Sequence, residues 1–128
     1  MNDLKNPLSP HLQIYRWHIS SLLSITHRIS GIINLLGLIL IFFWLIVLSL
    51  GESNYESFLL IINSFFGKFI LIGFTWSMCF HILSGIRHLA WDLGYGFEIK
   101  TANTSGIIVI ISSLILTVIF WLFARGLI

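Results

Sequence analysis

The chain has 128 residues, of which 57% are hydrophobic and 9% are charged, and its formal net charge is +2. Soluble domains carry about 25% charged residues, so this composition excludes an ordinary soluble domain and indicates an integral membrane protein. The small net charge and the scattered basic residues give no indication of nucleic-acid binding. The single cysteine, Cys79, lies in an apolar run and cannot form an internal disulfide.

Three apolar segments are long enough to cross a bilayer, which takes about 20 residues. The spans are predicted at residues 22–50, 58–92 and 106–125. The stretch GESNYES (51–57) is predicted to be a short aqueous loop, because a glycine and small polar residues interrupt the apolar run. The sequence therefore predicts an all-α integral membrane protein with three transmembrane helices. A single membrane-anchor domain would occupy residues 1–128, with an N-terminal segment over residues 1–20.

The basic residues predict an orientation. The loop between the first two spans has neither Lys nor Arg, whereas most basic residues would gather on the other side of the bilayer: Lys5, Arg16, Arg28, Arg87 and Lys100. Loops rich in Lys and Arg stay inside. This rule puts the N-terminus and the second loop inside and the C-terminus, near Arg125, outside.

Ionisable side chains lie within the first two spans, where hydrocarbon makes them costly. If the inner boundary is near Asp92, His81 is about 16 Å deep, close to the midplane of the bilayer. Five polar side chains of the same two spans lie nearer the inner surface: Ser24, His27, Arg28, Arg87 and His88. We expect these five to form one polar cluster, with His81 alone below it.

The spacing of His81 and His88 limits the cofactors that this region can bind. The two residues are two helical turns apart, about 10 Å along one face, so one metal ion cannot bind both from a straight helix. The spacing suits a flat, elongated cofactor such as haem b, with an axial ligand at one level and partners for its propionates nearer water. Gly85 and Gly31, each one turn from a histidine, leave space for a macrocycle or a helix.

The same residues have simpler interpretations, which the spacing leaves open. His81 could hydrogen-bond a backbone carbonyl of a neighbouring helix, or it could handle protons. Arg28 and Arg87 could be interfacial side chains that set the topology, and Ser24 could be a helix-packing residue. Three other functions stay open: a self-contained membrane cytochrome b, a histidine-based proton or solute transporter, or a packing subunit without a cofactor.

Two segments resemble one known family. NPLSPHLQIYRWHISSLLSITHRISG (6–31) is similar to the N-terminal part of the larger cytochrome b membrane-anchor subunit of succinate dehydrogenase, respiratory complex II. HILSGIRHLAWDLGYG (81–96) resembles the H-x-x-x-G-x-R-H-x-x-x-D segment of the same family. The sequence departs from many relatives at Asn6, where they have arginine, and at Trp17, where they have proline.

The resemblance implies a role for each matching residue. His81 matches the axial ligand of haem b, whose second ligand comes from a smaller anchor subunit. His27, Arg28 and His88 match groups near the haem propionates. Ser24 and Arg28 match the lining of the site where ubiquinone is reduced.

The resemblance also implies partners and a location. The chain would be a membrane-anchor subunit of succinate:ubiquinone oxidoreductase, not catalytic alone, in a complex with a flavoprotein subunit, an iron–sulfur subunit and a small membrane-anchor subunit. Electrons from succinate would pass through the iron–sulfur subunit to ubiquinone. The expected location of this multi-pass protein is the mitochondrial inner membrane or the bacterial cytoplasmic membrane.

Overall fold

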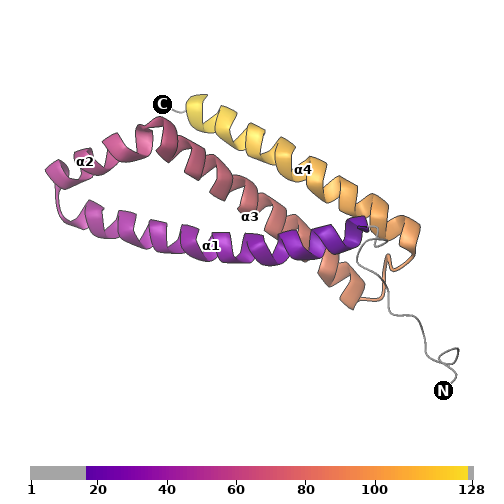
Figure 1. The fold of residues 1–128 in the computed structure, drawn as a ribbon. Coiled ribbons are helices and arrows are strands. Elements are labelled where there is room, and N and C mark those ends of the chain that lie inside the picture. The colour runs from indigo at the N-terminus through magenta and orange to yellow at the C-terminus, as the bar shows by residue number, and fades with distance from the viewer. Residues whose placement is uncertain (1–16, 127–128) are drawn as a thin grey trace, which may run out of the picture.

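A computed structural model describes residues 17–126, with Arg125 described by its backbone alone. All regular elements in this range are helices: α1 (Ile19–Ser49), α2 (Glu52–Asn63), α3 (Phe65–Asp92) and α4 (Ile99–Gly126) (Figure 1). The predicted all-α fold class is therefore confirmed for the described residues. The predictions that concern Lys5, Asn6, Arg16 and the Arg125 side chain lie outside them.

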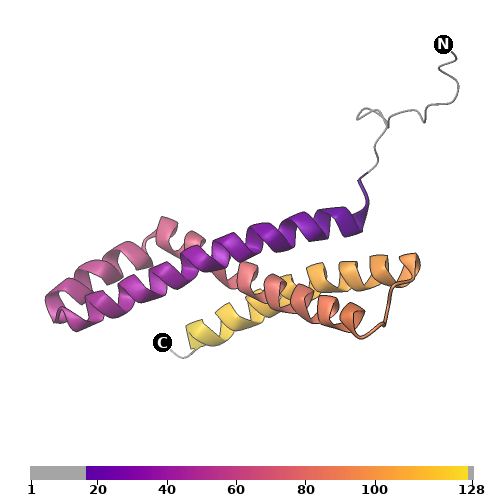
Figure 2. The ribbon, with the colours of Figure 1, turned by 90° about the horizontal axis from the view of Figure 1, so that it is seen from below.

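Three of the helices are long and apolar enough to cross a membrane: α1, α3 and residues Ile99–Ala124 of α4. Large apolar side chains cover much of their outer surface, as in Leu38 of α1, Met78 of α3 and Leu122 of α4. In an α-helix the backbone N–H and C=O groups bond one another, so they need no hydrogen bonds from the surrounding hydrocarbon, which offers none. The prediction of three membrane-spanning segments is confirmed in this sense. α1 begins and α4 ends at opposite ends of the bundle (Figures 1 and 2).

The predicted loop at residues 51–57 is wrong, because residues 52–57 form the first half of α2. The half-buried side chains of α2 recur at helical spacing: Tyr55, Phe58, Leu59 and Ile62. This spacing is typical of an amphipathic helix. The polar residues on its opposite face give the segment the composition of a loop. Phe58 packs against Phe43 of α1, with ring centroids 6.0 Å apart.

The second span begins later than predicted. Ser64 is in an extended conformation between α2 and α3, and its hydroxyl accepts a hydrogen bond from the backbone N–H of Gly67 at 3.1 Å. Serine is a favoured N-cap because its oxygen satisfies one of the free N–H groups of the first turn. The apolar segment predicted from residue 58 is thus divided at Ser64, and the long helix starts at Phe65.

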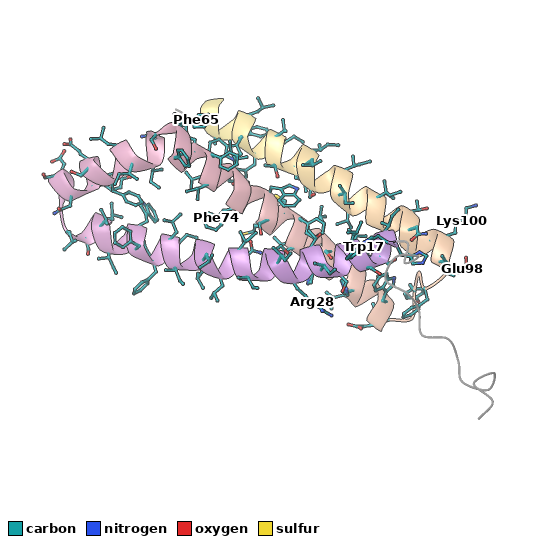
Figure 3. The ribbon with its side chains drawn as sticks, in the orientation of Figure 1. Trp17, Arg28, Phe65, Phe74, Glu98 and Lys100 are labelled. Carbon is teal, nitrogen blue, oxygen red and sulfur yellow. The ribbon has the colours of Figure 1, made fainter. Side chains whose placement is uncertain are left out.

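The helices α1 and α3 each contact all the other helices, and the two most extensive contacts, with α4 and with α1, both involve α3. α3 and α4 run side by side, and α1 crosses α3 (Figures 1 and 2). The apolar core contains Leu23 of α1, Phe80 of α3 and Val109 of α4. Phe74, which points into the space between α3 and α1 in Figure 3, packs against Gly37 of α1. Because glycine has no side chain, it permits a close approach of the two helices.

A tight connection follows α3. Gly94 has a φ of 87°, in the left-handed region that favours glycine. The N–H of Tyr95 bonds the carbonyl of Ala90 at 3.0 Å, and that of Gly94 bonds the carbonyl of Trp91 at 2.8 Å. These two bonds form a Schellman motif, which ends the helix. The chain then reverses and brings the first turns of α4 beside the last turns of α3.

Candidate functional site

The contact between α1 and α3 is polar at Ser30 and His81. Nδ1 of His81 lies 2.9 Å from Oγ of Ser30, and this hydroxyl donates its proton to the carbonyl of His27 at 2.7 Å. A hydroxyl has one proton to donate, so it accepts from the imidazole, and Nδ1 of His81 carries the hydrogen. Nε2 of His81 then keeps its lone pair, which is the form of histidine that binds a metal ion.

The rings of three histidines form one stack, which we call the histidine stack: His81, His27 and His88. The centroids of His27 and His81 are 4.1 Å apart with an interplanar angle of 8°, and those of His27 and His88 are 5.1 Å apart at 29°. The expectation that His81 stands alone is therefore wrong. Because α1 crosses α3, His27 lies between two histidines of α3 that are two turns apart.

The remaining polar atoms of the stack differ in their partners. Nδ1 of His88 donates to the carbonyl of Ser84 at 2.7 Å, which leaves Nε2 of His88 as its other polar atom. Nδ1 of His27 and the hydroxyl of Ser84 are buried, and neither has a hydrogen-bond partner within residues 17–126. A buried polar atom without a partner is costly, so Nδ1 of His27 and the hydroxyl of Ser84 are available to bond a bound group.

Arg87 does not join the predicted polar cluster, because its side chain faces α4. Its Nε donates to the hydroxyl of Ser105 at 3.0 Å, and a terminal nitrogen donates to the carbonyl of Ala102 at 2.9 Å. The guanidinium carbon lies 4.0 Å from the centroid of the Trp91 ring, in a cation–π contact. Arg87 is only 7% exposed. It therefore ties the end of α3 to the start of α4.

Ser24 and Arg28 are one turn apart on α1 and lie on the same side of this helix. Ser24 is half-buried, whereas Arg28 is exposed. In Figure 3 the Arg28 side chain points away from the bundle, on the side of α1 opposite to α4. Of the five residues predicted to form one cluster, His27 and His88 contact each other, while Arg87 and Arg28 point elsewhere.

Two glycines border the histidine stack in different ways. A Cβ added to Gly31 would lie 3.3 Å from Cε1 of His81, so the imidazole packs directly on the backbone of α1. A Cβ added to Gly85 would meet no atom within 4 Å. Gly31 therefore serves packing inside the chain, whereas Gly85 leaves open space beside α3.

The sequence analysis missed Ser30, Ser77 and Ser105. The hydroxyl of Ser77 donates to the carbonyl of Ser30 at 3.1 Å and adds a second polar bond between α1 and α3. A signal for Ser30 was present: it follows His27 by three residues, so the two share a helix face.

Within the described residues, no three His, Cys, Asp or Glu side chains form a group that could hold a metal ion.

These features define an integral membrane protein with three candidate spans, in which two crossing helices carry stacked histidines at their contact. The family described as succinate dehydrogenase/fumarate reductase transmembrane subunit matches residues 2–120, and the chain belongs to this family.

Curated relatives agree with this assignment. The chain is 44% identical to the succinate dehydrogenase cytochrome b556 subunit of Rickettsia prowazekii, over 91% of each chain. It is 37% identical to the cytochrome b556 subunit of Paracoccus denitrificans, over 93% of this chain and 92% of the relative. It is also 38% identical to the cytochrome b560 subunit of Marchantia polymorpha, over 84% and 82%. The resemblance to the cytochrome b membrane-anchor subunit of succinate dehydrogenase is thereby confirmed.

Proposed function

We propose that the chain anchors a succinate dehydrogenase complex in the membrane, binds haem b through Nε2 of His81, and forms part of the ubiquinone-reduction site. The observation that carries the haem proposal is the hydrogen bond between Nδ1 of His81 and Ser30, which leaves Nε2 unprotonated. The names of the relatives, cytochrome b556 and b560, support the same cofactor.

The residues around His81 fit a haem. Gly85, one turn from His81, has open space beside it, and Nδ1 of His27 is a buried polar atom without a partner in the described chain. Haem b, when bound, supplies a one-electron carrier whose iron accepts a neutral imidazole.

The second axial ligand belongs to another subunit in this proposal. His27 and His81 stack face to face with centroids 4.1 Å apart, so a macrocycle cannot lie between them. This contact argues against a self-contained cytochrome in which these two residues bind opposite faces of one haem. A small membrane-anchor subunit is the proposed source of the second histidine.

Three residues are proposed to meet the haem propionates: His27, His88 and Arg28. Nδ1 of His88 already bonds the carbonyl of Ser84, so Nε2 is the atom that would donate to a carboxylate when His88 is protonated. The exposed guanidinium of Arg28 has donors to offer a carboxylate.

Ser24 and Arg28 are proposed to bind the quinone head. The Ser24 hydroxyl would donate to a quinone carbonyl, and the guanidinium of Arg28 would stabilise the negative charge that develops on a quinone oxygen during reduction. Arg28 is exposed on the surface of this chain. A quinone beside it would therefore lie between this chain and another subunit, for which the iron–sulfur and small anchor subunits are proposed.

The proposed orientation puts the start of α1 and the α3–α4 connection on the inner side, where the flavoprotein and iron–sulfur subunits would dock. The absence of Lys and Arg between α1 and α2 supports it. The location is the mitochondrial inner membrane or the bacterial cytoplasmic membrane.

Replacing the proposed ligand tests haem binding. In the purified complex, we expect His81→Ala to lower the ratio of haem to flavin, and any haem that remains to bind carbon monoxide, because an axial position has been opened. His18→Ala is the control, since His18 is exposed and precedes α1. Wild-type haem content without carbon monoxide binding in His81→Ala would refute the proposal.

A second substitution tests the quinone site. We expect Arg28→Leu to lower succinate:ubiquinone reductase activity at least about tenfold, as expected when a donor to a developing oxyanion is lost. Succinate oxidation with a water-soluble artificial acceptor should persist, because that reaction does not use the membrane site. Lys100→Leu, at an exposed cation of α4, is the control. Equal loss of both activities, or of neither, would contradict the assignment of Arg28.

A further inference from the structure

We propose that Ser30 is a positioning residue for the haem iron. By accepting the Nδ1 hydrogen of His81, it sets both the orientation of this ligand and the electron density on Nε2. This inference rests on the proposed function, in which His81 binds haem b. It adds a residue on α1 to a site whose ligand lies on α3.

The hydrogen bonds of Ser30 are fully assigned by the contacts around it. Ser30 is 1% exposed, so solvent does not compete for its hydroxyl. The hydroxyl donates to the carbonyl of His27 and accepts from Nδ1 of His81. The carbonyl of Ser30 in turn accepts from the hydroxyl of Ser77. Ser30 is therefore held by bonds from both helices, and its oxygen is a fixed acceptor for the imidazole.

Three contacts fix the plane of the His81 ring. Ser30 bonds Nδ1, the ring of His27 covers one face at 4.1 Å, and the backbone of Gly31 lies against Cε1. Rotation of the ring would break the hydrogen bond and press the ring edge on α1. Of the three contacts, only the one with Ser30 acts directly on a nitrogen of the ring.

The same hydrogen bond has an electronic consequence. An imidazole that donates its N–H to an acceptor becomes a stronger electron donor at its other nitrogen. Stronger donation stabilises the oxidised iron relative to the reduced iron, and hydrogen bonding to an axial ligand is one way in which a protein tunes a haem. Loss of the Ser30 hydroxyl should therefore raise the midpoint potential of the haem.

The test compares Ser30→Ala with two other Ser→Ala variants in the purified complex. Ser77→Ala removes the neighbouring bond between α1 and α3, and Ser113→Ala removes a fully buried hydroxyl that bonds only within α4. We expect Ser30→Ala to keep its haem but to show a higher midpoint potential in a redox titration and altered g-values of the oxidised haem in electron paramagnetic resonance. Ser113→Ala should match the wild type in these properties. Ser77→Ala should change them less than Ser30→Ala does, because it leaves the bond to Nδ1 of His81 in place. A Ser30→Ala complex with the wild-type potential and g-values would overturn the inference.

A matched pair of variants keeps the test decisive if Ser30→Ala does not assemble. Ser30→Thr and Ser30→Val have the same shape and differ in the hydroxyl. We expect the Thr variant to resemble the wild type and the Val variant to show the shifted potential or to lose haem. Equal behaviour of the two variants, including failure of both to assemble, would overturn the role of the hydroxyl.

The two proposals can fail separately. If His81→Ala keeps the haem content and carbon monoxide response of the wild type, the haem assignment itself is wrong. If His81→Ala loses its haem while the Ser30 variants keep the wild-type potential and g-values, only the positioning role of Ser30 is wrong.

Discussion

Gly31 of α1 lies against the imidazole of His81 of α3, so that a methyl group at residue 31 would stand 3.3 Å from Cε1 of the ring. This separation is shorter than an ordinary carbon–carbon contact of about 3.5–4.0 Å. The ring or the helix would have to move by a few tenths of an ångström to accept it. The backbone of one helix therefore limits the position of the proposed ligand on the other.

Gly31→Ala should alter the haem environment without unfolding the chain. Alanine favours a helix over glycine by about 1 kcal/mol, so α1 should be retained, while the displaced ring should change the g-values of the oxidised haem. Gly73→Ala is the control, because a Cβ there meets no atom within 4 Å. Identical spectra for the two variants would show that the ring does not press on Gly31.

Gly85→Leu should report on what lies outside the chain. A side chain at residue 85 has open space within this chain, so its own helices should tolerate leucine. If a macrocycle or a partner helix occupies that space, the purified complex should contain less haem or less of the small anchor subunit. Gly73→Leu, at another open position of α3, is the matched control. Full haem content and subunit composition in Gly85→Leu would argue against a neighbour at this position.

Arg87→Ala should destabilise the contact between α3 and α4. The substitution removes two hydrogen bonds from a buried charged group, each worth about 1.5–3 kcal/mol, so we expect the free energy of unfolding to fall by about 3–6 kcal/mol. Thermal denaturation of the purified complex, monitored by size-exclusion chromatography, measures this loss of stability. Arg87→Lys should be intermediate, because lysine lacks the planar fork that bonds two acceptors and stacks on Trp91. Unchanged stability together with loss of haem would instead assign Arg87 to the cofactor.

Gly67→Ala should damage the corner between α2 and α3. A Cβ at Gly67 would collide with the backbone carbonyls of Ile61 and Ile62, which cannot move as a flexible side chain can. We expect a lower yield of assembled complex and faster proteolysis within α2. Ser64→Ala, which removes only the N-cap hydroxyl, should cost about 1 kcal/mol and leave assembly intact. Wild-type yield and protease resistance in Gly67→Ala would contradict this packing.

Hydropathy and the breaks between apolar segments predicted the three spans, because lipid imposes length and composition on any crossing helix. The same two signals did not predict α2. The residues GESNYES have the composition of a loop, and they become helical where Tyr55 and Phe58 can pack. Tertiary contacts decide such short amphipathic segments more than their composition does.

The residue types of the histidine stack were predictable, but their contacts were not. Depth along a span follows from counting residues, and this count separated His81 from His27. The crossing of α1 over α3 removes that separation, and sequence spacing within one helix carries no information on where two helices cross. The direction of Arg87 was missed for a related reason: α3 buries side chains against α4 as well as α1, and depth alone cannot assign a partner helix.

The attachment of Arg87 to the first turns of α4 bears on biosynthesis. In a nascent chain that ended before Ala102, the guanidinium of Arg87 would lack its hydrogen-bond acceptors in α4. A charged side chain without partners is energetically unfavourable in the membrane. We therefore expect α3 to leave the insertion machinery together with α4, as a helical pair, and α1 to pack against that pair afterwards.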